Sequence, residues 1–158
     1  MSANSINKIS KLFNYNPSTD SIITLAAGCY WGVEHHYRKH FQDKLKHVVV
    51  GFANGDDIFQ NQRRCCLTFS SDYTTLLPPT DKVEDIGTQY RSGIFASTEE
   101  DLKIAQASKE KWQPKWDNKI STEVELLRNY YDAEEYHQKY LIKNPEGYAC
   151  PAHYVRDI

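Results

Sequence analysis

The chain has 158 residues, a net charge of -2 and 40% apolar residues, which suits one packed domain beneath a polar surface. The near-balanced charge gives no broad positive field for phosphates and so excludes the usual basis of nucleic-acid binding. No apolar run approaches the roughly 18 residues that span a bilayer, and the polar lead over residues 1–20 lacks a signal-peptide core. We therefore expect a single domain over residues 1–158, cytoplasmic and without a membrane or nucleic-acid partner.

The first part of the chain predicts a strand, a helix and a second strand. Residues 22–27 form a continuous apolar run of strand length, and Gly28 then allows a sharp turn. Over residues 29–41 the apolar side chains recur at spacings of three and four, which predicts a helix with one buried face. Residues 47–52 predict the second strand, closed by the turn pair Asn54-Gly55.

A third strand and a second helix follow a stretch without a clear pattern. Residues 90–96 predict the strand. The segment Ser97-Thr98-Glu99-Glu100 has the form of a capping box, so we expect a helix to begin there and to stop before Pro114.

The last part of the chain continues the alternation of strands and helices. Residues 122–127 predict a strand, and residues 131–143 predict a helix that ends at Asn144-Pro145. Residues 147–158 have no periodicity and predict an irregular C-terminal tail. We therefore expect an α+β fold, an α/β sandwich in which a single mixed sheet is flanked by helices.

The cysteines bear on both the redox state and metal binding. They are Cys29, Cys65, Cys66 and Cys150. Their number and spacing do not suit the disulfide framework of a small secreted domain, so we expect thiols. No pair has the C-x-x-C spacing of a zinc ribbon. His36 and His40 are spaced as zinc ligands on a helix can be, but without an evident third ligand we expect no metal and no cofactor.

Cys29 is the strongest candidate for chemistry because it stands where the first strand ends and the first helix begins. A sulfur at that point faces unpaired N–H groups and the positive end of the helix dipole. An ordinary thiol, with a pKa of about 8.5, is only slightly ionised at neutral pH, and such a position lowers that pKa. The alternative is an inert buried cysteine, and position alone does not decide between the two.

The neighbours of Cys29 favour catalysis. Gly28-Cys29-Tyr30-Trp31-Gly32 resembles the nucleophile motif of the methionine sulfoxide reductase A family, which usually has Phe in place of Tyr30. The resemblance implies that Cys29 attacks the sulfoxide sulfur and that the rings of Tyr30 and Trp31 pack around the substrate methyl group. Outside this motif, two such aromatic side chains would be assigned to ordinary core packing.

Other segments also resemble the family: residues 50–55, 84–92, 131–138 and 143–148. Within the second of these, Asp85 and Tyr90 match the Asp and Tyr that help to hold the sulfoxide oxygen. The alternative roles are a turn cap for Asp85 and a sheet position for Tyr90. The resemblance therefore implies a substrate site that combines Asp85 and Tyr90 with the two aromatic side chains after Cys29.

Cys150 lies in Gly147-Tyr148-Ala149-Cys150-Pro151 and resembles the resolving cysteine of the family. The resemblance implies that the sulfenic acid left on Cys29 condenses with Cys150 to a disulfide, which a thioredoxin-like dithiol then reduces. Without the Cys29 motif, Cys150 would be interpreted as a stray thiol of the tail. The substrate implied is methionine S-sulfoxide, free or in proteins, and we expect a monomer.

Residues 56–83 depart from the family pattern. They are shorter than the family segment and show neither its Gly-His-Ala-Glu-like motif nor the strand and helix around it. Because loss of the sulfoxide oxygen requires a proton, the missing Glu predicts impaired catalysis, and the missing elements predict a smaller core. Nearby carboxylates, which we expect to be surface charges, are Asp72, Asp81 and Glu84. One hypothesis assigns residues from about Arg64 to Val83 to a different reading frame or splice choice, since family-like sequence resumes at Glu84.

Two further functions remain open at this point. The first is another thiol oxidoreductase, such as a thioltransferase or a peroxidase, which would prefer mixed disulfides or hydroperoxides to a methyl sulfoxide. The second is a catalytically impaired relative that only binds oxidised methionine or a partner, which the missing Glu favours.

Overall fold

A six-stranded sheet forms the centre of the protein in the computed structural model, which describes residues 10–12, 14, 16, 18–54, 64–70 and 92–147. The strands are β1 (Ile22–Ala26), β2 (His47–Ala53), β3 (Arg64–Ser70), β4 (Gly93–Ala96), β5 (Glu123–Leu126) and β6 (Tyr130–Asp132). The helices are α1 (Tyr30–Phe41), α2 (Glu99–Trp112) and α3 (Tyr140–Lys143), with short 3-10 turns η1 (Gln42–Lys44) and η4 (Gln113–Trp116).

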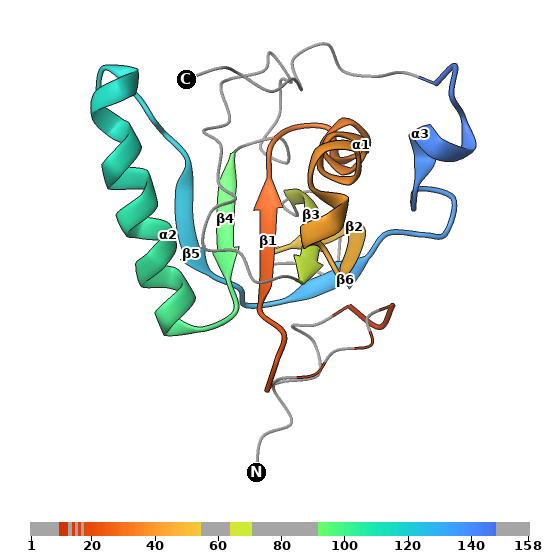
Figure 1. Ribbon diagram of the computed structural model, residues 1–158, viewed down its shortest axis with the longest axis horizontal. Coiled ribbons are helices and arrows are strands. Elements are labelled where there is room, and N and C mark those ends of the chain that lie inside the picture. The colour runs from red at the N-terminus through yellow and green to blue at the C-terminus, as the bar shows by residue number, and fades with distance from the viewer. Residues whose placement is uncertain are drawn as a thin grey trace.

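The strand order is β5-β4-β1-β3-β2-β6 (Figure 1). Neighbouring strands are antiparallel except for β4 and β5, which are parallel. The sheet is therefore mixed, and the predicted α+β class is confirmed. The predicted tail lies almost wholly beyond the described residues, and so does most of the polar lead.

β1 lies inside the sheet, and all five of its residues are buried. Ile23 and Leu25 join the core cluster that contains the α1 side chains, while Ala26 joins a second cluster with Phe95. Alternate β1 side chains thus enter two separate clusters. A strand covered on both faces gives an uninterrupted apolar run rather than an alternating one, which is the pattern of residues 22–27.

α1 follows β1 in the chain and packs on one face of the sheet before the chain enters β2 (Figure 1). Its buried positions include Tyr30, Val33 and Tyr37, spaced by three and four residues as predicted. They pack in one cluster with Val48 and Val50 of β2. This packing fixes the N-terminal end of α1, where Cys29 stands, relative to the sheet.

β3 corrects the prediction that residues 56–83 had lost a core strand. It pairs with both β1 and β2, so that Leu67 lies opposite Leu25 on one side and Val50 on the other. The local sequence Arg64-Cys65-Cys66-Leu67-Thr68-Phe69-Ser70 lacks flanking turn signals and a clean alternation. Its strand conformation follows from pairing on both edges, because strand formation depends more on neighbours than on intrinsic preference.

The predicted helix over residues 131–143 is wrong for most of its length. Residues Tyr130–Asp132 form β6 beside β2, residues 135–139 form turns, and only Tyr140–Lys143 is helical. Lys139 has a φ of 55°, outside the right-handed helical region, and this interrupts the helix before it can extend backwards from α3. Tertiary contacts described below hold these turns in place.

α2 lies along the outer side of the sheet next to β5 (Figure 1). Its N-cap is Thr98, one residue after Ser97, the first residue of the predicted capping box. The Thr98 hydroxyl accepts from the Asp101 N–H at 3.1 Å. The helix ends at Trp112, before Pro114 as predicted. None of the helices in the described part of the chain has the length and apolar character to cross a membrane.

Candidate active site

The turn between β1 and α1 presents Cys29. Gly28 has a φ of 83°, a conformation that favours glycine because it has no Cβ. Cys29 follows as the N-cap of α1 and is partly exposed. The first turn of α1, which is described in full, carries no acidic residue. The helix dipole therefore acts on the Cys29 sulfur without a nearby opposing charge in that turn, which stabilises negative charge on it.

Four aromatic rings lie together: Tyr30 and Trp31, which directly follow Cys29 in the chain, and His137 and Tyr140. Trp31 stacks on Tyr140, with ring centroids 3.8 Å apart and planes at 14°, and on His137 at 5.6 Å and 21°. Tyr30 is buried, and its ring centroid lies 5.7 Å from that of His137. We call this group the aromatic wall. It combines both predicted substrate residues of α1 with two rings from the end of the described chain.

No local sequence signal predicts a role for His137 or Tyr140. The spacing of residues 131–143 placed them on a continuous helix, which hid the turns that bring their rings onto Trp31. Two buried ring nitrogens, Nε1 of Trp31 and Nδ1 of His137, have no hydrogen-bond partner within the described structure. Buried polar atoms are normally paired, so these nitrogens are candidates to bind a ligand.

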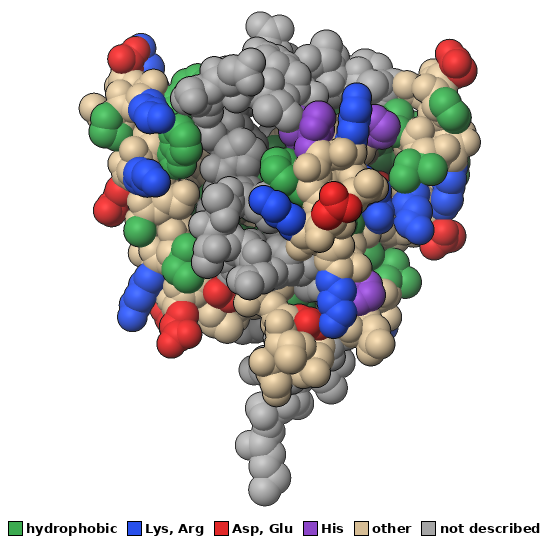
Figure 2. Space-filling model, viewed as in Figure 1, with side chains coloured by type: hydrophobic (Ala, Val, Ile, Leu, Met, Phe, Trp, Pro, Cys, Tyr) green, Lys and Arg blue, Asp and Glu red, His purple; other side chains and the backbone are tan. Residues whose placement is uncertain are grey.

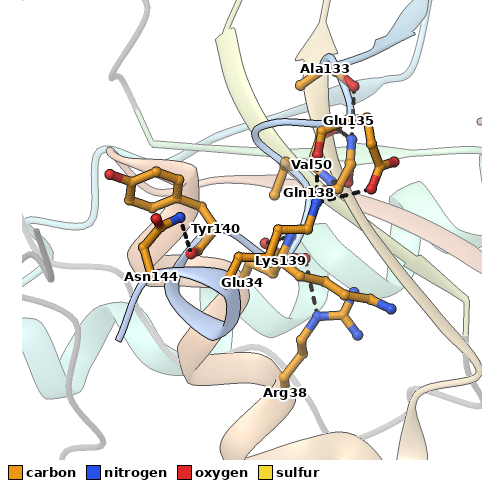
Figure 3. Close-up of polar contacts among 10 residues, drawn as sticks. Glu34, Arg38, Val50, Ala133, Glu135, Gln138, Lys139, Tyr140 and Asn144 are labelled. Atoms are coloured by element: carbon orange, nitrogen blue, oxygen red, sulfur yellow. Dashed lines mark hydrogen bonds and ion pairs between the residues drawn. The ribbon is translucent and has the colours of Figure 1, made fainter. Parts of the chain in front are cut away.

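Gln138 connects the segment that carries His137 to the sheet (Figure 3). Its side chain is 6% exposed and makes three hydrogen bonds. The carbonyl oxygen accepts from the Val50 N–H at 3.0 Å, and the amide nitrogen donates to the carbonyls of Val50 at 2.8 Å and Ala133 at 2.9 Å. An amide with these partners fixes the turn against β2.

Glu34 connects the same segment to α1 (Figure 3). Its side chain is 2% exposed, accepts from the Lys139 N–H at 2.9 Å and forms an ion pair with Arg38 at 3.0 Å. Burial raises the pKa of the Glu34 carboxyl, against the opposing effects of the Arg38 charge and of both hydrogen bonds. Glu34 and Gln138 together hold the segment that carries His137 in contact with α1 and β2.

Glu34 is the one fully buried carboxylic acid among the described residues, and a buried acid with a raised pKa suits proton delivery. However, its two oxygens are bonded to Arg38 and to the Lys139 N–H. We therefore assign Glu34 to the connection between α1 and the turns rather than to proton transfer.

The other predicted site residues lie outside the described part of the chain: Cys150, Asp85 and Tyr90. Their roles stay predictions. Within residues 10–12, 14, 16, 18–54 and 92–147, no group of three or more His, Cys, Asp or Glu side chains is arranged to hold a metal ion. Over the face shown in Figure 2, Lys and Arg side chains are interspersed with Asp and Glu.

Comparison with known proteins identifies the family. The family model described as peptide methionine sulfoxide reductase matches residues 69–157. Peptide methionine sulfoxide reductase of Saccharomyces cerevisiae is 43% identical over 180 aligned positions, which cover 95% of this chain and 98% of that protein. The chain belongs to the peptide methionine sulfoxide reductase family. MsrA of Clostridium acetobutylicum is 40% identical over 150 positions, covering 80% of this chain and 91% of that relative.

Solved structures from this reductase family have the same fold. Mxr1 from Saccharomyces cerevisiae in reduced form gives a TM-score of 0.84 at 42% identity, covering 95% of this chain and 99% of that one. Mxr1 in an unusual oxidized form and Mxr1 in complex with Trx2 each give 0.70, at 42% and 41% identity, covering 99% and 94% of this chain and 100% and 99% of theirs. Among these three structures the reduced form gives the highest TM-score.

The match to the reductase family also bears on residues 56–83. The alignment with the yeast reductase has 180 positions and the chain 158 residues, so at least 22 positions (180 minus 158) face a gap in this chain. The family model already matches from residue 69, before Glu84, where the family-like sequence was expected to resume. The match therefore begins inside the segment that the hypothesis assigns to a different reading frame or splice choice, and that hypothesis stays a prediction.

Proposed function

We propose that the chain is a peptide-methionine (S)-S-oxide reductase in which Cys29 is the nucleophile and Cys150 the resolving cysteine. Membership of the family makes the chain an oxidoreductase that acts on methionine sulfoxide with thiols as the source of electrons. The observation that supports Cys29 most directly is its position at the N-terminus of α1, between the Gly28 turn and the aromatic wall.

In the first step the Cys29 thiolate attacks the sulfoxide sulfur. This forms a transient S–S bond between Cys29 and the substrate, and the sulfoxide oxygen takes up one proton from the solvent. The substrate S–O bond and the transient S–S bond then break, the oxygen passes with its proton to the Cys29 sulfur, and methionine leaves. Two electrons move from the Cys29 sulfur to the substrate sulfur, so Cys29 is oxidised to a sulfenic acid. The dipole of α1 stabilises the thiolate before the attack. The rings of Tyr30 and Trp31 pack around the substrate methyl group, and Asp85 and Tyr90 bind the sulfoxide oxygen through hydrogen bonds.

In the second step the Cys150 thiol attacks the sulfenic sulfur of Cys29 and expels water, which leaves a Cys29–Cys150 disulfide. A thioredoxin-like dithiol then reduces this disulfide by exchange and becomes a disulfide itself. The complex of yeast Mxr1 with Trx2 supports this choice of reductant. The cycle transfers two electrons and requires no metal or organic cofactor.

We also propose one domain over residues 1–158 that acts as a monomer in the cytoplasm. A reducing compartment keeps its cysteines as thiols and supplies a dithiol reductant. A single mass by analytical ultracentrifugation and one unfolding transition would support these proposals, and a stable dimer or two separate transitions would contradict them.

The test of the reaction uses purified protein, the two separated epimers of methionine sulfoxide and either dithiothreitol or thioredoxin. We expect the S epimer alone to be reduced. Cys150→Ser should release one methionine per enzyme and then stall with thioredoxin, while a small thiol restores part of the turnover. Faster reaction with a hydroperoxide would favour a peroxidase, and binding without turnover would favour a relative that only binds oxidised methionine.

A further inference from the structure

Tyr136 extends the aromatic wall into solvent. Its side chain is 61% exposed, yet its ring makes edge-on contacts with two members of the wall. The centroid distances are 5.2 Å to His137, with planes at 79°, and 5.6 Å to Tyr140, with planes at 66°. Both partner rings stack on Trp31. The exposed ring of Tyr136 is therefore linked through His137 and Tyr140 to Trp31, which stands two residues after Cys29.

The backbone around Tyr136 is fixed before any ligand binds. Gln138 binds β2 through the Val50 N–H and carbonyl, and Glu34 accepts from the Lys139 N–H. On the other side, Lys143 donates to the Glu135 carbonyl at 2.8 Å and to its carboxylate at 2.9 Å. A binding surface held in position loses little conformational entropy when it is occupied.

We propose that Tyr136 forms a subsite for an aromatic side chain next to the oxidised methionine of a peptide substrate. This inference rests on the proposed function. Free methionine sulfoxide has no neighbouring residue and fills only the space at Cys29. In an extended peptide, successive residues advance by about 3.3–3.6 Å each. The ring centroids along the wall are spaced on the same scale, 3.8 Å from Trp31 to Tyr140 and 5.6 Å from Tyr140 to Tyr136. A side chain one or two positions from a methionine bound at Trp31 therefore extends along the wall toward Tyr136.

The contact geometry favours an aromatic occupant. The Tyr136 ring meets its two neighbours edge-on, and aromatic pairs prefer such tilted or offset arrangements to face-to-face stacking. An incoming ring would add one further member to the wall. A flexible polar side chain would gain no comparable contact there, so the subsite discriminates among peptides and leaves reduction of the free amino acid unaffected.

The experiment measures kcat and KM with dithiothreitol, which removes docking of a protein reductant from the assay. The substrates are free methionine sulfoxide and two peptides, one with Trp and one with Ser beside the oxidised methionine. Tyr136→Ala is compared with Tyr136→Phe, which keeps the ring. Ile104→Ala, which truncates another exposed apolar side chain, on α2, is the matched control.

We expect Tyr136→Ala to lower kcat/KM for the Trp peptide about three- to tenfold, mainly through KM. The Ser peptide and free methionine sulfoxide should be unchanged, Tyr136→Phe should behave as wild type, and Ile104→Ala should change nothing. An equal loss on all three substrates, or no loss on any, would overturn the subsite. The assays are then repeated with thioredoxin in place of dithiothreitol, and a loss that appears only in this second series would assign the surface to the reductant and also overturn the subsite.

Binding separates failure of the subsite from failure of the proposed reaction. In the Cys29→Ser background, fluorescence anisotropy of the labelled peptides gives dissociation constants without turnover. Tighter binding of the Trp peptide that is lost in Tyr136→Ala supports the subsite even if no sulfoxide is reduced. Equal affinities for both peptides would reject the subsite even if reduction proceeds.

Discussion

The two long helices in the described part of the chain, α1 and α2, begin in opposite ways. α2 has a side-chain cap from Thr98, three acidic residues in its first turn and two lysines in its last turn, and it buries only Ala105. α1 has no side-chain cap hydrogen bond and no acid in its first turn, yet it buries five residues. Local signals therefore stabilise α2, whereas packing stabilises α1. The N-terminus of α1 is left to Cys29, because a carboxylate there would oppose a thiolate.

Replacement of the cap residue of α1 should have the largest effect on activity. We expect Cys29→Ser to abolish reduction of methionine sulfoxide, because a serine hydroxyl is a far weaker nucleophile than a thiolate. Stability should be retained, since serine is a favoured N-cap. Turnover and a urea unfolding curve measure the two effects. Residual activity close to wild type would remove Cys29 from the mechanism.

Repair of the shortened segment should have the next largest effect. A version in which residues 56–83 are replaced by a family-like segment with its Glu should reduce sulfoxide about 10² to 10⁴ times faster, which is the typical contribution of a positioned general acid. In the unmodified chain, the single-turnover rate should rise as pH falls for as long as Cys29 stays ionised. If both versions are equally fast, an acid such as Asp72 or Glu84 serves in the unmodified chain.

Removal of Glu34 tests whether α1 depends on its packing. Glu34→Ala removes the ion pair of Arg38, which keeps its hydrogen bond to the Val48 carbonyl, and leaves the Lys139 N–H without its acceptor. This should cost about 2–3 kcal/mol of unfolding free energy. It should also lower turnover, because the turn that carries His137 loses its hydrogen bond to α1 and keeps only the stacking on Trp31. Denaturant titration and steady-state kinetics measure both. A stable and fully active variant would contradict the proposed connection.

The pH dependence of stability gives a second test of Glu34. Burial raises the pKa of the Glu34 carboxyl above the ordinary 4.5. At pH values between 4.5 and this raised pKa, the folded chain therefore binds more protons than the unfolded chain. Stability contributed by the protonated form is then complete below 4.5 and is lost as pH rises through the raised pKa. Glu34→Gln should remove this loss. Parallel stability curves for Glu34→Gln and wild type against pH would contradict the raised pKa.

Local sequence was sufficient where an element carries its own signals. Three local signals each predict the observed element: the apolar run of β1, the spacing of the buried side chains of α1, and the start and stop signals of α2. The turn at Gly28 and the position of Cys29 follow from the same signals, because both lie at the junction of two well-predicted elements.

Local sequence was insufficient where distant residues decide the conformation. β3 forms because β1 and β2 pair with its two edges. Residues 135–139 form turns because Gln138 binds Val50, 88 residues away, and Lys139 binds Glu34, 105 residues away. The contacts of His137 and Tyr140 with Trp31 depend on those turns, so half of the aromatic wall was not predictable from spacing.

The smallest effect is expected at the cap of α2, the counterpart of Cys29. Thr98→Ala removes the hydrogen bond to the Asp101 N–H at 3.1 Å and should cost about 1 kcal/mol of unfolding free energy. Turnover should be unchanged, because no described contact links Thr98 to the aromatic wall. Thr98→Ser, which keeps an accepting hydroxyl, is the matched control for the loss of stability. A fall in kcat with unchanged stability would show that α2 contributes to the site, and would remove the division between a helix that serves the reaction and one that serves the fold.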